Sequence, residues 1–181
     1  ALSIHLEAKT AYLAEILRAG GADIAVTGSN PLSTKDDVVA ALAEEGISVY
    51  AVHGASSEEY HSFINDVLDI ATDIIVDDGG DLVHLIHEER HELLPGVSGA
   101  CEETTAGVLR DRARYKAGKL AFPVVAVNDA YCKHLFDNRY GTGQTSWEAI
   151  TRVTNLVIAG KVSVVAGYGW CGKGCALRAR G

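Results

Sequence analysis

Residues 162–174 read VSVVAGYGWCGKG, and this stretch decides which fold we expect. A run of apolar residues leads into Gly167, Gly169 and Gly172, and the residues that follow are compatible with a helix. In a dinucleotide-binding unit the first glycine makes a tight turn, the second lets the backbone approach a pyrophosphate, and the third lets helix and strand pack closely. The helix N-terminus adds amide donors and a partial positive charge. The spacing therefore favours a pyrophosphate-binding turn. The alternative is a tight strand-to-helix turn that binds no ligand, as any doubly wound sheet can contain.

The composition describes an ordinary globular protein. The chain has 181 residues, of which 48% are hydrophobic and 22% charged, which suits one domain with a sizeable core. A net charge of -8 argues against a nucleic-acid partner, because phosphate-binding surfaces need clustered Lys and Arg. No apolar run is long enough to span a membrane, and no signal peptide is recognisable. We therefore expect a cytoplasmic protein.

The cysteines do not predict a metal site. They form no CxxC pair, so we expect no structural zinc site and no bound metal. Two of them are only four residues apart on an expected helix, a geometry that disfavours a disulfide. We expect reduced thiols at all four positions, Cys101, Cys132, Cys171 and Cys175.

Short β-branched runs alternate with helical patterns along the whole chain. This alternation predicts an α/β fold, a doubly wound parallel sheet with helices on both faces. The strand before the first helix is expected to lie outside this sequence. We expect one domain over residues 1–160 and the start of a second over 161–181. The expected strands are 22–29, 47–54, 73–81, 122–129 and 162–169; the expected helices are 5–21, 34–45, 58–70, 81–94, 103–117 and 143–160.

Polar clusters follow three of the expected strands. They are Ser29-Asn30, residues 77–81 (DDGGD) and Asn128-Asp129. Asp and Asn are also common turn and cap residues, which would explain any single cluster. Three clusters at the carboxyl ends of parallel strands instead predict a polar ligand site in the crevice at that edge.

Residues 87–91 read HEERH, which matches the zinc-protease pattern of two histidines on one helical face with a glutamate as base. His84 adds a third imidazole three residues earlier. No further ligand is marked downstream, and short motifs of this length match by chance. We favour a solvated polar helix over a zinc site at His87 and His91.

Two further segments carry chemistry-bearing residues. Residues 128–144 read NDAYCKHLFDNRYGTGQ, in which Lys133 and Asp137 could form an ordinary helical ion pair or a lysine could exchange a proton with a sugar hydroxyl. Residues 101–107 read CEETTAG, in which two glutamates and two hydroxyls could line a site or simply begin a helix.

Taken together, these segments resemble S-adenosylhomocysteine hydrolases. The runs DDGGDL, EETTAG, NDAYCKHLFDNRYGTGQ and IAGKVSVVAGYGWCGKG occur in the order and spacing of that family. SIHLEAKTA and TGSNPLSTKDDV resemble its earlier segments, so the resemblance covers essentially all 181 residues.

The resemblance implies a Rossmann-like substrate domain, followed by the start of an NAD-binding Rossmann domain, in a homotetramer. These enzymes hold NAD tightly and recycle it. The 3′-hydroxyl of the adenosyl ribose is oxidised, and the ketone acidifies the neighbouring 4′ C–H. Homocysteine is then eliminated, water adds, and the ketone is reduced to give adenosine. Hydride and proton transfer both need a fixed ribose with positioned acids and bases.

The motif match also implies roles for individual residues. Lys133 and Asp137 would handle the 3′-hydroxyl proton, and Glu103 would hold the ribose hydroxyls. Asp78 and His5 would serve proton transfers on the leaving-group side. The residues that would contact NAD are Thr104, Thr105, Asn138, Gly167, Gly169 and Gly172.

The chain departs from the family pattern at several positions. Many members carry threonine and glutamate at the positions of Glu7 and Lys9, so base or ribose recognition differs here, as in a bacterial or archaeal thermophile-like subgroup. An inosyl substrate therefore stands beside the adenosyl one. Ala106 stands where a threonine is common in the family, and Thr142 stands where a cysteine is frequent.

The sequence also looks like an internal fragment of a chain more than twice as long. A fragment is expected to be inactive, and a non-catalytic nucleoside-binding module remains the alternative from another class.

Overall fold

The computed structural model describes residues 1–180, which divide into two compact units. The first is Ala1–Val127, and the second begins at Asn128. This division differs from the predicted boundary at residue 160, which stays a prediction for the intact protein. No helix among the described residues has both the length and the apolar character needed to cross a bilayer.

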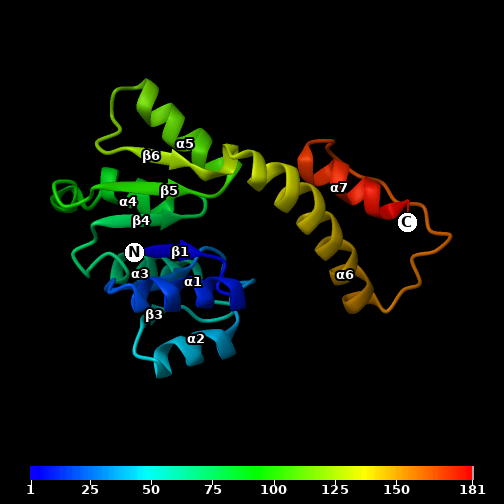
Figure 1. The fold of residues 1–181 in the computed structure, drawn as a ribbon, viewed down its shortest axis with the longest axis horizontal. Helices are drawn as coiled ribbons and strands as arrows, with labels where there is room; N and C mark the ends of the chain where they lie inside the picture. The colour runs from blue at the N-terminus through cyan, green and yellow to red at the C-terminus, as the bar shows by residue number, and fades with distance from the viewer. Residues whose placement is uncertain (181) are drawn as a thin grey trace. The chain divides into compact units, whose positions relative to one another are not determined.

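Six parallel strands form one sheet in the first unit (Figure 1), in the order β3-β2-β1-β4-β5-β6. The chain starts at the centre, adds strands outward on one side, and then returns to add strands on the other. Ligands of open parallel sheets bind where this reversal occurs, here between β1 and β4. The predicted doubly wound α/β fold is thus confirmed. The strands are β1 Leu2–Ile4, β2 Ala25–Gly28, β3 Ser48–Tyr50, β4 Ile74–Asp77, β5 Gly99–Glu102 and β6 Val124–Ala126.

The strand that precedes the first helix lies within this sequence, so our expectation that it lay outside was wrong. β1 pairs with β2 from Leu2 to Ile4 and with β4 at Leu2 and Ser3. Leu2 and Ser3 are buried. A three-residue strand is too short to show an alternating pattern, and only its two neighbours make it the centre of the sheet.

Five α-helices connect these strands. Ser56 and Glu59 form a reciprocal capping box at the start of α3. The Thr104 hydroxyl accepts a hydrogen bond from Gly107 N at the start of α5. The helices are α1 Ala8–Ala19, α2 Asp36–Glu44, α3 Ser57–Asp66, α4 Asp81–Glu88 and α5 Thr105–Lys116.

The sheet separates two hydrophobic clusters. Successive residues of a strand point to opposite faces, so Ala25 and Val26 belong to different clusters. Leu82, Leu85 and Ile86 of α4 pack in the larger cluster, and Leu42 of α2 in the smaller. Helices on both faces leave the ends of the strands as the open edge of this layered fold.

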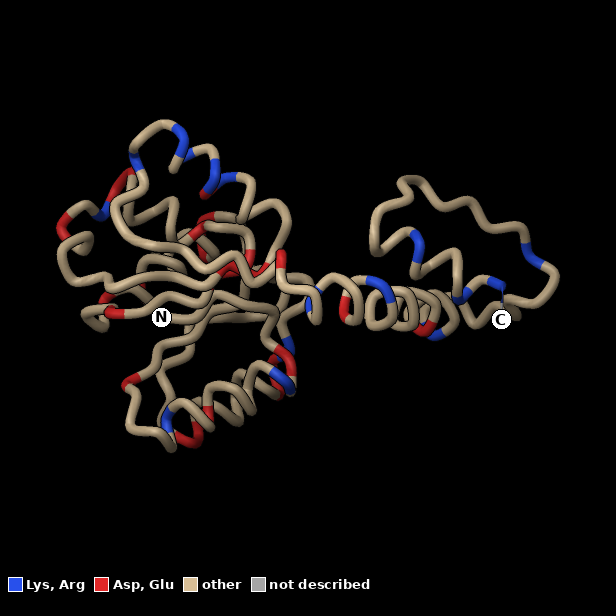
Figure 2. The backbone as a smooth tube through the Cα atoms, turned by 45° about the horizontal axis from the view of Figure 1, so that its top comes forward, with Lys and Arg blue, Asp and Glu red and all other residues tan. Residues whose placement is uncertain are grey.

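Basic residues are spaced along α5 (Figure 2), and two of them form ion pairs with acidic residues of α4. Arg110 Nη1 is 2.7 Å from an oxygen of Asp81, and Arg114 Nη1 is 2.7 Å from an oxygen of Glu88. These ion pairs connect neighbouring helices within the first unit.

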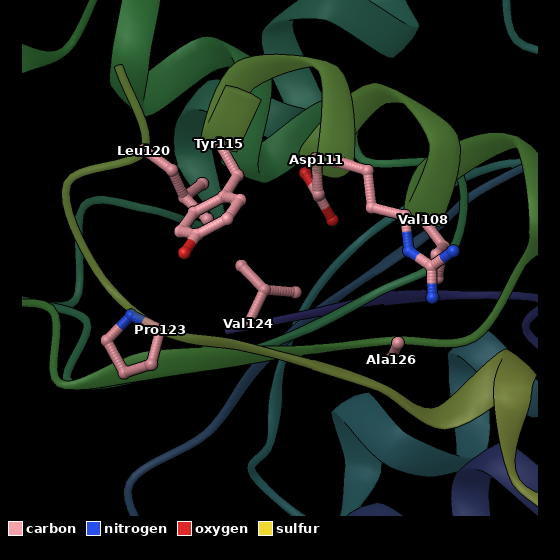
Figure 3. Close-up of a pocket in the computed structure, with 8 residues that line it drawn as sticks. Val108, Asp111, Tyr115, Leu120, Pro123, Val124 and Ala126 are labelled. Carbon is pink, nitrogen blue, oxygen red and sulfur yellow. The ribbon is translucent and has the colours of Figure 1, made fainter. Parts of the chain in front are cut away.

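A cavity of about 410 Å³ lies between α5 and the edge strand β6. Asp111 and Tyr115 from α5 and Val124 from β6 line it (Figure 3). Its lining is mostly apolar, yet Asp111 is buried and its Oδ2 has no hydrogen-bond partner among the described residues. Burial, with a smaller effect from the charge of Glu102, raises the pKa of Asp111 to about 6.

Replacing Asp111 with asparagine is therefore expected to stabilise the protein at pH 8 by about 1–3 kcal/mol. Because the folded-state pKa is raised, the stability linked to this group is complete below the unfolded value of 3.8 and is lost as pH rises through about 6. The gain should shrink between pH 6 and 4, where the native carboxyl becomes neutral as well. Urea unfolding at pH 8 and pH 5 measures this, with exposed Asp23→Asn as the control. An equal gain at both pH values would contradict the argument.

Among its described residues, the second unit contains one π-helix and two α-helices. They are a π-helix, Lys133–Gly141, followed directly by α6, Thr142–Thr154, and then α7, Trp170–Ala179. α6 ends earlier than predicted because Asn155 adopts the left-handed conformation, φ +53°, that terminates helices. The Trp147 indole donates to Cys175 O at 2.8 Å and so connects α6 to α7.

The predicted strand at 162–169 is absent, and that prediction was wrong. Val162 and Val164 are 95% and 92% exposed. A strand needs a hydrogen-bonded neighbour, and residues 128–180 contain no other strand with which this segment could pair. The apolar residues face a cavity of about 540 Å³ that Trp147 and Ile150 of α6 also line.

Candidate functional site

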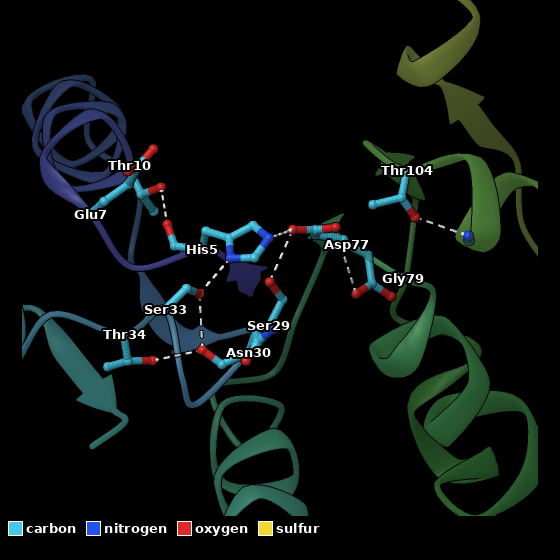
Figure 4. Close-up of polar contacts among 12 residues, drawn as sticks. His5, Glu7, Thr10, Ser29, Asn30, Ser33, Thr34, Asp77, Gly79 and Thr104 are labelled. Carbon is cyan, nitrogen blue, oxygen red and sulfur yellow. Dashed lines mark hydrogen bonds and ion pairs between the residues drawn. The ribbon is translucent and has the colours of Figure 1, made fainter. Parts of the chain in front are cut away.

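A polar network lies at the ends of β1, β2 and β4, where the order of strands along the chain reverses (Figure 4). His5 follows β1, Ser29 follows β2 and Asp78 follows β4. His5 Nε2 is 3.3 Å from Asp78 Oδ2, and the Ser29 hydroxyl donates to the same oxygen at 2.9 Å. The Asp78 side chain is only 5% exposed and that of His5 is 48% exposed. The structure thus gives a buried carboxylate in contact with an imidazole that solvent or a ligand can reach.

The loop after β2 orients the other side of the imidazole. His5 Nδ1 lies 2.5 Å from the hydroxyl of Ser33. Asn30 builds this loop, because its side chain accepts from Leu32 N and its carbonyl accepts from Ser33 Oγ and Thr34 Oγ1. Asn30 is therefore a turn residue, whereas Ser29 and Ser33 contact the His5–Asp78 pair.

Two buried carboxyl groups lie beneath this network, and the sequence analysis placed them in polar clusters without giving either a role of its own. Asp77 and Glu102 end β4 and β5 and are completely buried. Asp77 accepts from Asp78 N and from Val83 N, both at 3.0 Å, and so fixes the start of α4. Burial is the largest influence on Asp77 and raises its pKa to about 7. Strand alternation could have identified both residues, since Asp77 shares a face with buried Ile75 and Glu102 with buried Ala100.

The segment after β5 carries three predicted site residues. Glu103 N donates to Asp77 O at 3.0 Å, which places Glu103 beside the end of β4. The Thr104 hydroxyl donates to Glu102 Oε1 and also caps α5. Thr105 is the exposed first residue of α5. CEETTAG thus contains the start of α5, but neither glutamate lies in the first turn of that helix. Glu103 and Thr105 lie beside the open edge, and their roles in a site stay predictions.

Lys133, Asp137 and Asn138 belong to the second unit and lie on the π-helix. Lys133 Nζ donates to Asn128 Oδ1 at 2.9 Å. Asn138 Nδ2 donates to Cys171 Sγ, at 3.3 Å, in the first turn of α7. The unit therefore brings one predicted NAD residue, Asn138, to the helix that begins after the glycine turn.

The glycine turn before α7 fits a pyrophosphate group. Gly167 has φ +94°, a conformation that other residues rarely adopt. A Cβ on Gly172 would overlap Gly167 O, so the third glycine permits the close packing that the motif requires. A Cβ on Gly169 would meet nothing within 4 Å, which leaves open space above the first amides of α7. These amides and the helix dipole suit an anionic ligand.

The HEERH segment does not form the helix on which a zinc site would depend. α4 ends at Glu88, and His91 begins a separate 3₁₀ turn, His91–Leu93. His87 is buried rather than solvated: its Nε2 accepts from Ala121 N and its Nδ1 donates to Val83 O. Burial lowers the pKa of His87. Because both ring nitrogens have backbone partners, His87 acts as a core residue, whereas His84 and His91 are exposed, as the solvated-face interpretation predicts.

Comparison with known proteins agrees with the resemblance. Residues 1–94 match the family model for S-adenosyl-L-homocysteine hydrolase, and residues 138–181 match the model for the NAD-binding domain of that enzyme. An adenosylhomocysteinase of Pyrococcus abyssi is 61% identical over 181 residues, which are 100% of this chain and 43% of the relative. An S-inosyl-L-homocysteine hydrolase of Methanocaldococcus jannaschii is 61% identical over 180 residues, 99% of this chain and 43% of the relative.

A third relative, an adenosylhomocysteinase of Archaeoglobus fulgidus, is 54% identical over 180 residues, 99% of this chain and 44% of the relative. The chain therefore spans less than half the length of the relatives it matches. One of the two matching family models covers more than half of the chain by itself. The chain belongs to the S-adenosyl-L-homocysteine hydrolase family.

Proposed function

We propose that this chain is part of an NAD-dependent hydrolase that converts S-adenosyl-L-homocysteine reversibly to adenosine and L-homocysteine through a 3′-keto intermediate. The observation that carries the proposal is the His5–Asp78 pair, held by Ser29 and Ser33 at the sheet reversal. Family membership supports the reaction class. A homotetramer and a cytoplasmic location belong to the same proposal.

The residues of the first unit would perform the chemistry on the leaving-group side. His5 and Asp78 would take the 4′ proton and return a proton as homocysteine leaves, with Ser29 keeping the Asp78 carboxylate in place. Glu103 would accept hydrogen bonds from the ribose hydroxyls.

The residues of the second unit would serve the 3′-hydroxyl and the cofactor. Lys133 and Asp137 would exchange the 3′-hydroxyl proton, with Asn128 orienting the ammonium group. When bound, NAD would accept the hydride that leaves ribose C3′ and would later return it to C3′. The residues that would hold it are Thr104, Thr105, Asn138, Gly167, Gly169 and Gly172.

S-inosyl-L-homocysteine is the second candidate substrate. Lys9 and Glu7 form an ion pair, 3.4 Å from Nζ to Oε1, just after His5. Where many family members present a carboxylate that can accept from an adenine amino group, Lys9 presents a donor. A donor suits the oxo group of hypoxanthine better, and the Methanocaldococcus relative carries that name.

The test is homocysteine release from both substrates, with NAD added, by this chain and by a protein of full family length that contains it. We expect turnover by the full-length protein and none by the 181-residue chain. Preference for the inosyl substrate would establish the second candidate. A folded, NAD-loaded full-length protein that releases no homocysteine from either substrate would favour the non-catalytic nucleoside-binding module instead.

A further inference from the structure

Glu102 connects two loops through one oxygen of a completely buried carboxylate. Its Oε1 accepts from Gly79 N at 2.9 Å, from Thr104 N at 2.8 Å and from Thr104 Oγ1 at 2.9 Å. Gly79 belongs to the turn after β4, and Thr104 to the turn after β5. A single acceptor thus satisfies three donors from two segments that are 25 residues apart in the sequence, residues 79 and 104.

The second oxygen of Glu102 has no hydrogen-bond partner, and the whole carboxyl group is closely packed. Oε2 is buried without a hydrogen-bond partner among residues 1–180. The α5 backbone passes against the carboxyl group at Gly107, where a Cβ would overlap Glu102 Cδ and both of its oxygens. A buried carboxylate with an unsatisfied oxygen is costly, and an apolar side chain would avoid that cost. The role of Glu102 must therefore depend on its other oxygen, Oε1, and on the three donors that Oε1 binds.

The two donors lie next to the two carboxylates of the proposed reaction. Gly79 directly follows Asp78, and Thr104 directly follows Glu103. Asp77 binds the backbone amides of Asp78 and Glu103 themselves: its side chain accepts from Asp78 N, and its carbonyl accepts from Glu103 N. Asp78 and Glu103 are thus fixed by hydrogen bonds to the backbone on both sides of each.

We infer that Glu102 is a positioning residue, which ties the turn after β4 to the turn after β5 and thereby sets the relative positions of Asp78 and Glu103. This inference rests on the proposed function, because it is the proposed reaction that uses those two carboxylates. Misplacing reacting groups by about 1 Å can cost about 10²-fold in rate.

Three variants of the full-length protein test the inference. Glu102→Ala removes the acceptor, and we expect kcat per NAD-loaded site to fall about 10²-fold. Glu102→Gln keeps an oxygen for the three donors, with its amide NH₂ in place of Oε2, and should stay within about tenfold of the wild type. Gly107→Ala keeps Glu102 but displaces its carboxyl group, so it should be as defective as Glu102→Ala.

The double variant gives the sharpest test. The three nearest atoms to a Cβ at Gly107 belong to Glu102, so a methyl group there should cause no further loss once Glu102 is alanine. A full additional loss in the double variant would overturn the inference, because Gly107 would then matter for another reason. Glu102→Gln as inactive as Glu102→Ala would mean that the charge, not the positioning, is needed. Unchanged kcat in Glu102→Ala would also overturn it.

A measurement without turnover separates this inference from the proposed function. In Glu102→Ala, hydrogen exchange at the amides of Gly79 and Thr104 should speed up, while exchange in β1 and β4 should not change. If the wild type releases no homocysteine, the proposed function fails, whereas this exchange pattern would still support the tie between the loops. Unchanged exchange at both amides would refute the tie even in an active enzyme.

Discussion

Replacing Lys133 with methionine is expected to lower kcat for homocysteine release by about 10²–10⁴-fold in the full-length protein. Methionine keeps most of the length and the apolar stem of lysine but has no ammonium group. It can neither donate to Asn128 Oδ1, as Lys133 Nζ does at 2.9 Å, nor exchange a proton with the 3′-hydroxyl. NAD content should be unchanged, because Lys133 is not among the residues proposed to hold NAD.

The measurement is steady-state turnover per NAD-loaded site, beside an exposed lysine of α5 changed in the same way, Lys116→Met. The control should retain wild-type kcat. If Lys133→Met retained it as well, Lys133 would have no role in the proton transfer. If NAD content fell in parallel with activity, the residue would be structural.

The fold was largely predictable from the sequence because β-branched runs and helical patterns alternate. The errors occur where a strand depends on its neighbours. Two short strands, Leu2–Ile4 and Gly99–Glu102, were not expected within this sequence, yet each pairs on both sides and becomes an inner strand of the sheet. Residues 162–169 have a clear strand pattern, but without a partner strand in residues 128–180 they form none.

The candidate site was predictable in part, because polar residues that directly follow parallel strands meet at one edge of the sheet. The positions of Ser29 and Asp78 after expected strands predict a polar site at this edge, and the two side chains do meet there. The resemblance alone marked His5, because β1, the strand that places it beside Asp78, was not expected within this sequence. The buried partners Asp77 and Glu102 were noted only within polar clusters and received no role, because each belongs to a pair of identical residues. The sequence alone does not show which member points inward until the strand ends are known.

Gly174→Ala is expected to destabilise the second unit, by about 1–3 kcal/mol. A Cβ on Gly174 would overlap Arg139 O on the π-helix, and a Cβ on the facing Gly143 would lie 2.6 Å from Gly174 C. Both obstacles are backbone atoms, which cannot move aside as a flexible side chain can. The methyl group must therefore push α7 away from the π-helix and α6.

This displacement should also cost NAD affinity, because Asn138 contacts Cys171 at the start of α7 and the proposed pyrophosphate site lies at the same helix end. Gly169→Ala is the matched change. Its backbone conformation suits alanine and its Cβ would meet no protein atom, so it should leave the melting temperature unchanged. The added methyl group should nevertheless obstruct a bound pyrophosphate and raise the Kd for NAD by about tenfold or more. Thermal unfolding and NAD titration of both full-length variants distinguish the two effects. A lowered melting temperature in Gly169→Ala, or an unaltered one in Gly174→Ala, would contradict the assignment of Gly169 to the ligand and Gly174 to helix packing.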